Sequence, residues 1–229
     1  MSRWASIILP ENWAGCEIRM RIREKPSIDG LGFVMCDEPE GLIVELKQVH
    51  SAYVVTVDEP RKAEKITGSE GDGLITACRG IWLRIKTADC VPLFLYEPKA
   101  QLIGAVHIGW RGLKARIASV AIEHFVKEFS VKPENILAFI GPSICWRHYE
   151  VGLEFRSWFN RPILFEDAHK ALHLDLKLGV KLELLSSGVQ ESSIITSPLC
   201  TYEFPFLASF RREREDLKDQ IDNLIRLKI

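Results

Sequence analysis

The chain of 229 residues is 47% hydrophobic and 27% charged, a composition typical of a globular protein rather than a disordered one. Thirty basic and thirty-one acidic side chains give a formal charge of −1, which argues against nucleic acid as the main partner because duplex-binding proteins usually carry a basic excess. Its apolar runs fall short of the roughly 18–20 residues that a membrane span needs.

The N-terminal apolar stretch, within residues 1–10, ends too early for a secretory signal. Six scattered cysteines, none of them in a C-x-x-C pair, fit reduced thiols that pack as small hydrophobic side chains. We therefore expect a cytoplasmic protein with no membrane partner. The length suits one large domain or two small ones.

Strand patterns prevail along the chain. Residues 16–23 alternate apolar and polar side chains, as a half-buried strand does. Short apolar runs rich in β-branched residues and bounded by Gly, Pro, Asp or Lys predict further strands, at 42–46, 53–57, 81–85, 91–96, 102–106 and 136–140.

Helical periodicity appears at 113–129, 152–159, 174–185 and 213–227. Gly188 is expected to end the third of these helices. Leu217, Ile221 and Leu224 would form the apolar stripe of the last one. Because strands outnumber helices and several follow one another directly, the pattern predicts an α+β fold with mixed sheets.

Three segments place a metal-binding side chain at the edge of a predicted strand, namely His50, Cys90 and His107. Two imidazoles and a thiolate suit Zn²⁺ or copper better than Mg²⁺ or Ca²⁺. Three protein ligands would leave the fourth tetrahedral position open to water or substrate, as in catalytic zinc sites. Each residue alone equally fits a structural role in the core, and the spacings of 40 and 17 positions match no zinc-finger signature.

Two neighbours of these residues carry charge. Asp89 precedes Cys90 and would orient a ligand imidazole or a water, or it simply ends a strand. Residues 109–112 form a glycine-flanked turn before a predicted helix, where free N–H groups and Arg111 would hold an anion. Ordinary strand-to-helix turn chemistry is the alternative for that segment.

Lys47 and Gln48 lie shortly before His50. Since side chains alternate along a strand, Gln48 would share the face of His50 and Lys47 would point the other way. Gln48 is thus the better substrate-binding candidate of the two. Cys145 and His148 lie in a predicted turn entering a helix, where we expect a structural role.

Six motifs occur in an order that resembles the laccase-domain family, also called the YfiH-like or polyphenol oxidase family. They are KQVH (47–50), TADCVP (87–92), VHIGWRG (106–112), IGPSI (140–144), YEVG (149–152) and CTY (200–202). The resemblance spans roughly residues 42 to 212. It implies a single domain over residues 1–229, built as an α+β sandwich of mixed sheets with helices outside.

Carried over to this sequence, the metal ligands of that family fall on His50, Cys90 and His107. Its members are largely regarded as purine nucleoside-processing enzymes, with zinc as cofactor and copper as the alternative. The resemblance therefore implies phosphorolysis of adenosine, guanosine, inosine and methylthioadenosine, and hydrolytic deamination of adenosine. The implied partners are a small purine nucleoside and phosphate.

Two other functions remain open. The older laccase name implies copper-dependent oxidation of phenols, although a four-copper centre needs many histidines and this chain has six in total. Family members usually begin with a longer segment bearing Thr-Arg, Gly-Gly-Val-Ser and Ser-Leu-Asn patterns, and the 46 residues before Lys47 show none of them. A degenerate, metal-stabilised module that binds a partner is the second alternative.

Overall fold

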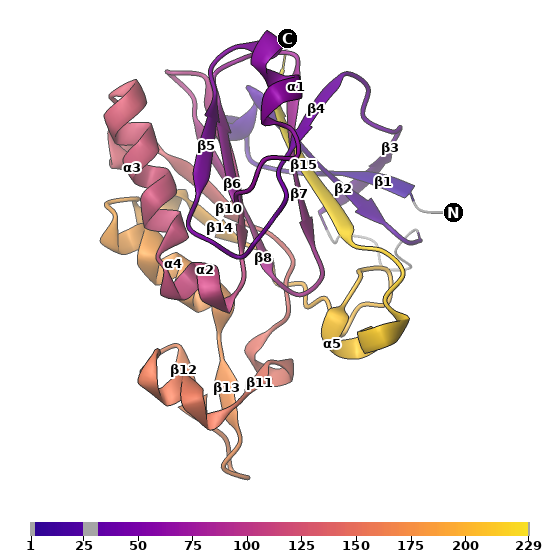
Figure 1. Cartoon of the computed structure of the whole chain (residues 1–229), viewed down its shortest axis with the longest axis vertical. Helices are drawn as coiled ribbons and strands as arrows, with labels where there is room; N and C mark the ends of the chain where they lie inside the picture. Colours follow the sequence, from indigo (N-terminus) through magenta and orange to yellow (C-terminus); the bar gives the residue numbers. More distant parts are fainter. Residues whose placement is uncertain (1–2, 25–31, 229) are drawn as a thin grey trace.

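Two large sheets and one small sheet organise the computed structural model, which describes residues 3–24 and 32–228 (Figure 1). In spatial order the first sheet contains β3 (Phe33–Cys36), β1 (Arg3–Ile7), β2 (Cys16–Ile22), β15 (Ile221–Leu227), β7 (Ile81–Thr87) and β4 (Leu42–Glu45). The second contains β14 (Ile194–Thr196), β10 (Leu137–Ile140), β8 (Val91–Glu97), β9 (Leu102–Ile108), β6 (Gly73–Thr76) and β5 (Val54–Val57). The small sheet contains β11 (Glu150–Val151), β13 (Leu172–Leu174) and β12 (Leu164–Glu166).

Both large sheets are mixed. In the first, β4 pairs parallel with β7, whereas β15 pairs antiparallel with both β2 and β7. In the second, β5 is parallel to β6 and β8 is antiparallel to β9. This arrangement confirms the predicted α+β class with mixed sheets, and each of the seven predicted strands corresponds to an observed one.

The helices are α1 (Ala63–Ile66), α2 (Trp110–Lys114), α3 (Ile117–Phe129), α4 (Leu176–Ser186) and α5 (Phe210–Glu213). Helices α2, α3 and α4 lie along one side of the second sheet, with the first sheet on its other side (Figure 1). Strands β8 and β9 are therefore buried along their whole lengths, and apolar side chains fill both interfaces.

Of the four predicted helices, one agrees with the structure, two need correction in extent or type, and the last is wrong. Helix α4 agrees with the prediction, and Gly188 follows it at a φ of 92° that glycine adopts without strain. The predicted helix at 113–129 is two helices, because Arg116 has a left-handed φ of 60°. The segment at 152–159 forms only a short 3₁₀ helix, Leu153–Ser157.

The predicted helix at 213–227 is wrong, since its second half is the strand β15. Leu217, Ile221 and Leu224 are spaced as on a helix, but periodicity in so short an apolar run is ambiguous. Strand β15 pairs with β2 on one side and with β7 on the other, so its backbone N–H and C=O groups find partners in the sheet. This pairing makes the segment a strand.

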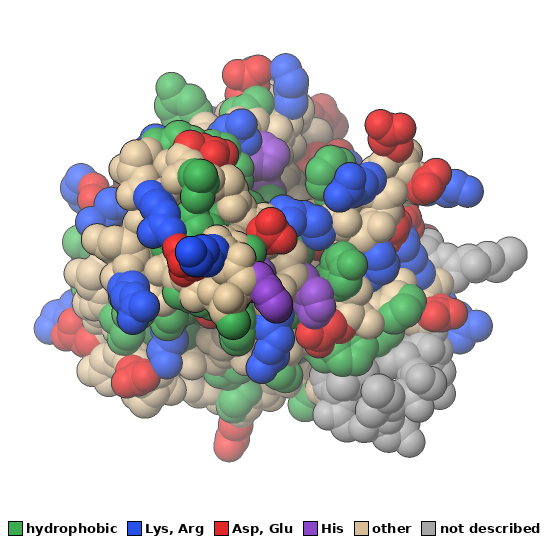
Figure 2. Space-filling view, turned by 90° about the horizontal axis from the view of Figure 1, so that it is seen from below, with side chains coloured by type: hydrophobic (Ala, Val, Ile, Leu, Met, Phe, Trp, Pro, Cys, Tyr) green, Lys and Arg blue, Asp and Glu red, His purple; other side chains and the backbone are tan. Residues whose placement is uncertain are grey.

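None of the helices among the described residues is long and apolar enough to span a membrane. Figure 2 shows basic and acidic side chains interspersed over one face of the molecule, in keeping with the formal charge of −1. Opposite charges mixed in this way do not form the continuous basic footprint of a nucleic-acid site on that face.

Candidate metal centre

Strand directions explain how residues far apart in the chain meet. The connection from β4 to β5 carries His50, and the connection from β7 to β8 carries Cys90, so both run from the first sheet to the second. His107 lies near the end of β9, opposite Pro92 at the start of the antiparallel β8. All three residues therefore lie at one end of the sandwich.

The donor atoms of His50, Cys90 and His107 all lie within 4.8 Å of one another. The two imidazole rings meet edge to face, with centroids 4.9 Å apart and an interplanar angle of 78°. His107 is buried, Cys90 is half-buried and His50 is exposed, so the group faces solvent on one side. Two nitrogens and a sulfur at these separations fit a tetrahedral Zn²⁺ with one position free.

Gly109 lets these side chains approach one another. A Cβ at this position would lie 3.0 Å from Sγ of Cys90 and 3.0 Å from Cδ2 of His50. Both contacts are tighter than ordinary van der Waals packing. Glycine at the N-terminus of α2 therefore leaves room for the donors to converge.

Asp72, fully buried just before β6, holds the loop that carries His50. Its carboxylate accepts hydrogen bonds from the backbone N–H groups of Val49 (3.2 Å), His50 (3.0 Å) and Ser51 (2.7 Å) and from the Ser51 hydroxyl (2.8 Å). It also lies 2.9 Å from Nδ1 of His107. With the proton on Nδ1 donated to Asp72, Nε2 of His107 is left as the ring atom able to bind a metal.

These contacts shift the pKa values of the three groups. Burial opposes the charged form of Asp72, but hydrogen bonds from His107 and Ser51 outweigh it and lower the pKa to about 2. Burial likewise opposes a Cys90 thiolate, yet hydrogen bonds from His107 and His50 lower its pKa to about 7. Burial disfavours protonated His107, whereas Asp72 and then Cys90 raise its pKa to about 9. The thiol at this site therefore ionises far more readily than an ordinary cysteine.

A cavity of about 550 Å³ lies against the three donors. The rest of the lining mixes aliphatic side chains with polar and aromatic ones from the ends of several elements: Leu46, Gln48, Lys86, Ala88, Asp89, Trp110, Tyr149, Phe210, Arg211, Leu217 and Gln220. Trp110 stacks on Trp158 with centroids 4.9 Å apart, so this part of the wall is fixed. The size suits a small organic ligand.

Asp89 faces this cavity from the connection between β7 and β8. Its Oδ1 accepts from the Thr201 hydroxyl at 2.6 Å and its Oδ2 accepts from the backbone N–H of Arg211 at 2.6 Å. The backbone φ of 90° at Asp89 is uncommon outside glycine, and these bonds stabilise it. One carboxylate thus joins the Cys90 loop to two segments near the C-terminus.

The strand predicted around Gln48 ends at Glu45, so the argument from alternating side chains does not apply there. Gln48 lines the cavity, and its amide pairs in both directions with the backbone of Lys86, at 2.8 and 2.7 Å. Lys47 is exposed and bonds to Glu70 at 3.0 Å, away from the cavity lining.

The cavity lining includes Arg211 and does not include Arg111, the residue that the sequence suggested. Helix α2 begins at Trp110, so residues 109–112 are its first turn rather than a turn before a later helix. The Arg111 guanidinium lies 4.2 Å from the centroid of Trp110 and outside the cavity lining. Arg211 lines the cavity, lies 5.4 Å over the Tyr149 ring and donates to the carbonyl of Glu150 at 2.9 Å.

Sequence reasoning did not single out Asp72, Tyr149 or Arg211. Asp72 lies between two glycines immediately before an apolar run, a pattern that marks a close backbone approach at the start of a strand. Arg211 lies just before the helix predicted at 213–227. Its position in the site depends on β15 returning to the centre of the first sheet.

The chain belongs to the family described as multi-copper polyphenol oxidoreductase laccase, whose family model matches residues 34–221. It is 37% identical over 186 residues to a purine nucleoside phosphorylase of Deinococcus radiodurans, a match that covers 80% of this chain and 68% of that protein. It is 32% identical over 171 residues to the adenosine deaminase RL5 of an unknown prokaryotic organism, covering 69% of this chain and 65% of that one.

Solved structures show the same fold. The crystal structure of YlmD from Geobacillus stearothermophilus matches with a TM-score of 0.81 and 25% identity, over 96% of this chain and 94% of that chain. The structure of YfiH from Bacillus licheniformis matches with a TM-score of 0.80 and 23% identity, over 97% of both chains. The predicted resemblance to the YfiH-like family is thereby confirmed.

Proposed function

We propose that this chain is a zinc-dependent enzyme that processes purine nucleosides, by phosphorolysis and by deamination of adenosine. The observation that carries the proposal is the convergence of His50, Cys90 and His107 on one side of a cavity of about 550 Å³. The relatives named purine nucleoside phosphorylase and adenosine deaminase support it. The preferred nucleosides would be adenosine, guanosine, inosine or methylthioadenosine.

His50, Cys90 and His107 would hold the metal. When bound, zinc would supply Lewis acidity and would activate water at neutral pH. Asp72 fixes the His107 tautomer through Nδ1, and its hydrogen bonds hold His50 in place. Pre-positioned ligands of this kind spare the site from reorganising when substrate binds.

The cavity walls suit a nucleoside. The rings of Trp110, Tyr149 and Phe210 line it, and flat aromatic side chains stack on bases with little sequence preference. In deamination, water adds to C6 of the purine, the C6–N6 bond breaks and ammonia leaves. Asp89 is the cavity carboxylate placed to accept and hand on the proton that this exchange requires.

In phosphorolysis, the bond from the anomeric carbon to the purine breaks and a bond to a phosphate oxygen forms. The leaving purine takes a proton, for which Asp89, the carboxylate of the cavity lining, is again the candidate. Phosphate needs a cation, and Arg211 supplies one from the wall of the cavity. We therefore prefer Arg211 to Arg111 as the phosphate-binding residue, and Gln48 to Lys47 as the residue that faces substrate.

The test is incubation of the purified chain with adenosine and phosphate, followed by chromatography for adenine, inosine and hypoxanthine. His107→Ala should abolish both activities, and the control His169→Ala, at an exposed position, should leave them unchanged. Arg211→Ala should raise the KM for phosphate at least about tenfold while deamination persists. No purine product from the zinc-loaded protein, or full activity of His107→Ala, would refute the proposal.

The family description favours a second candidate, copper-dependent oxidation of phenols. A set of two histidines and one cysteine also binds blue copper. Such a site would colour the purified protein intensely and would turn over phenols without nucleoside. A colourless zinc-loaded protein that cleaves nucleosides would exclude this candidate.

A further inference from the structure

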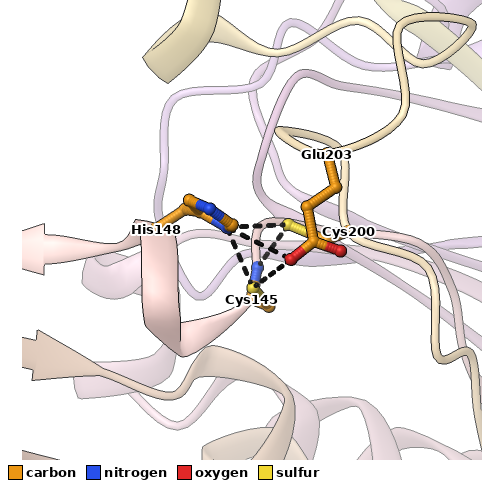
Figure 3. A group of neighbouring side chains, drawn as sticks. All are labelled: Cys145, His148, Cys200 and Glu203. Atoms are coloured by element: carbon orange, nitrogen blue, oxygen red, sulfur yellow. Dashed lines mark hydrogen bonds and ion pairs between the residues drawn. The ribbon is translucent and has the colours of Figure 1, made fainter.

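A second group of metal-binding side chains lies outside the site described above. Figure 3 shows Cys145, His148, Cys200 and Glu203 pointing toward one another from two separate segments. One donor atom from each lies within 4.8 Å of every other. We call these four residues the Cys145 cluster, and it shares no residue with the His50, Cys90 and His107 group.

The backbone builds the Cys145 cluster from two short turns. Cys145 precedes the 3₁₀ helix Trp146–His148, and the N–H of His148 donates to the carbonyl of Cys145 at 3.1 Å. In the same way the N–H of Glu203 donates to the carbonyl of Cys200 at 3.2 Å. Side chains three residues apart on a 3₁₀ turn project on the same side. Each turn therefore presents a pair of donors, Cys-x-x-His and Cys-x-x-Glu.

A parallel bridge between Ser143 and Cys200 brings the two turns together. The N–H of Thr201 also donates to the carbonyl of Ser143, at 3.2 Å. The N–H of Cys145 points at Sγ of Cys200, 3.2 Å away. A backbone N–H directed at sulfur stabilises a thiolate, as hydrogen bonds to metal ligands commonly do.

The separations match those around a tetrahedral zinc ion. Sγ of Cys145 lies 3.3 Å from Nδ1 of His148 and 3.7 Å from Oε1 of Glu203. Nδ1 of His148 lies 3.5 Å from Oε1 of Glu203 and 3.7 Å from Sγ of Cys200. Metal–ligand bonds of about 2.0–2.3 Å at tetrahedral angles place neighbouring donors about 3.3–3.8 Å apart. Four donors at these distances are what a closed, structural zinc site requires.

Charge and burial agree with a bound cation. Two thiolates and a carboxylate around Zn²⁺ leave a single negative charge, which the nearby Lys177 balances. Its ammonium donates to the carbonyls of Ser197 and Leu199, at 2.9 and 2.7 Å, just before Cys200. Cys200 is buried, whereas the side chains of His148 and Glu203 are 29% and 42% exposed, so an ion can enter from solvent.

We propose that the Cys145 cluster binds a structural Zn²⁺ through two thiolates, one imidazole and one carboxylate. The ion fastens residues 143–149 to residues 200–203. Both segments also hold Asp89, because the N–H of Ile144 donates to its carbonyl at 3.0 Å and the Thr201 hydroxyl donates to its carboxylate. The second ion thus stiffens one wall of the cavity without facing the cavity's three metal donors.

The experiment measures zinc per chain by mass spectrometry after loading with zinc alone and removal of excess on a chelating resin. The wild-type chain should hold two equivalents, and Cys145→Ser/Cys200→Ser should hold one. His50→Ala/His107→Ala should also drop to one, the ion that the Cys145 cluster retains. The control Cys78→Ser, which changes a thiol elsewhere, should keep two. Unchanged stoichiometry in the Cys145 and Cys200 double variant would overturn the proposal.

A milder pair guards against misfolding of the double cysteine variant. His148→Asn and Glu203→Gln alter only the partly exposed ligands, and each should weaken the second zinc at least about tenfold in chelator competition. Cobalt loaded into His50→Ala/His107→Ala should give the visible bands of a tetrahedral site with two thiolates. A Cys145–Cys200 disulfide in protein prepared under reductant, or cobalt bands that His148→Asn leaves intact, would refute the site. Neither the zinc stoichiometry nor the cobalt spectrum depends on nucleoside turnover. Failure of the second zinc site is therefore distinguishable from failure of the proposed function.

Discussion

Replacing Asp72 with asparagine tests whether this carboxylate organises the metal centre. Both of its oxygens accept hydrogen bonds, Oδ1 from His50 N–H and His107 Nδ1, and Oδ2 from Val49 and from Ser51. An amide has one acceptor oxygen, so its NH₂ group must face donors in either orientation. If NH₂ faces His107, the ring must carry its proton on Nε2 and can no longer offer that atom to a metal.

The magnitude follows from burial and charge. The pKa of Asp72, about 2 against an ordinary value of 3.8, corresponds to about 2 kcal/mol of stabilisation at neutral pH. A buried donor left without a partner adds about 1–3 kcal/mol of destabilisation. We therefore expect Asp72→Asn to lower the free energy of unfolding by about 3–5 kcal/mol. Zinc affinity should fall by about 10–100-fold, as for other groups that orient a metal ligand.

Urea unfolding of the metal-free protein measures the first quantity, and competition with a fluorescent chelator measures the second. Glu183→Gln is the matched control, since this buried carboxylate accepts a hydrogen bond from the N–H of Ser119 at 2.8 Å, away from the metal centre. It should change stability and leave affinity at the centre unaltered. Zinc binding by Asp72→Asn within about twofold of wild type would contradict the argument.

The same variant has a pH signature. Because the folded-state pKa of Asp72 is lowered, its contribution is complete above pH 3.8 and is lost as pH falls through about 2. The wild-type unfolding free energy should therefore decline between pH 4 and pH 2 more steeply than that of Asp72→Asn. If the unfolding free energies of the two proteins declined equally between pH 4 and pH 2, this carboxylate would not be stabilised in the folded state.

Three further predictions concern the metal and the cavity. Gly109→Ala should weaken zinc binding at least about tenfold by displacing the donors, whereas Gly112→Ala, whose Cβ would meet Ile117 instead, should not. Zinc affinity at this centre should rise from about pH 6 to pH 9. Binding must displace protons from the Cys90 thiol and the His107 imidazolium, whose pKa values lie near 7 and 9. Calorimetry in buffers of different ionisation enthalpy should detect the released protons. Phe210→Ala should raise the nucleoside KM about tenfold with kcat little changed, and an unaltered KM would remove this ring from the binding site.

The strands were predictable from local pattern. Apolar β-branched runs bounded by breakers predicted β7, β8 and β9, because these signals act over a few residues. The proximity of His50, Cys90 and His107 followed from residue type and from the family motifs, and not from spacing. Strand ends converge only once the two sheets are stacked, and no short-range pattern specifies that.

What the sequence could not predict depends on contacts between distant segments. Leu217, Ile221 and Leu224 fit a helical stripe, and only the two neighbouring strands make the later part of that segment β15. The sequence pointed to Arg111 as the anion-binding residue and did not single out Arg211. In the fold, the Arg111 guanidinium stacks on Trp110. Arg211 reaches the cavity because the segment before β15 leads into the centre of the first sheet.

Loops carry most of this site, and polar side chains make those loops rigid. Asp72 binds three successive N–H groups around His50, Gln48 pairs in both directions with the backbone of Lys86, and Asp89 receives a hydroxyl and an N–H from segments more than a hundred residues away. The hydrogen bonds of these three side chains replace the strand pairing that a loop lacks, since buried backbone groups must find partners. Metal-binding side chains on loops held in this way can meet at angles that adjacent strand positions cannot reach, because strand side chains alternate between faces. This convergence requires strained backbone at His50 and Asp89, with positive φ values of 58° and 90°. The hydrogen bonds made by Asp72 and Asp89 stabilise that backbone.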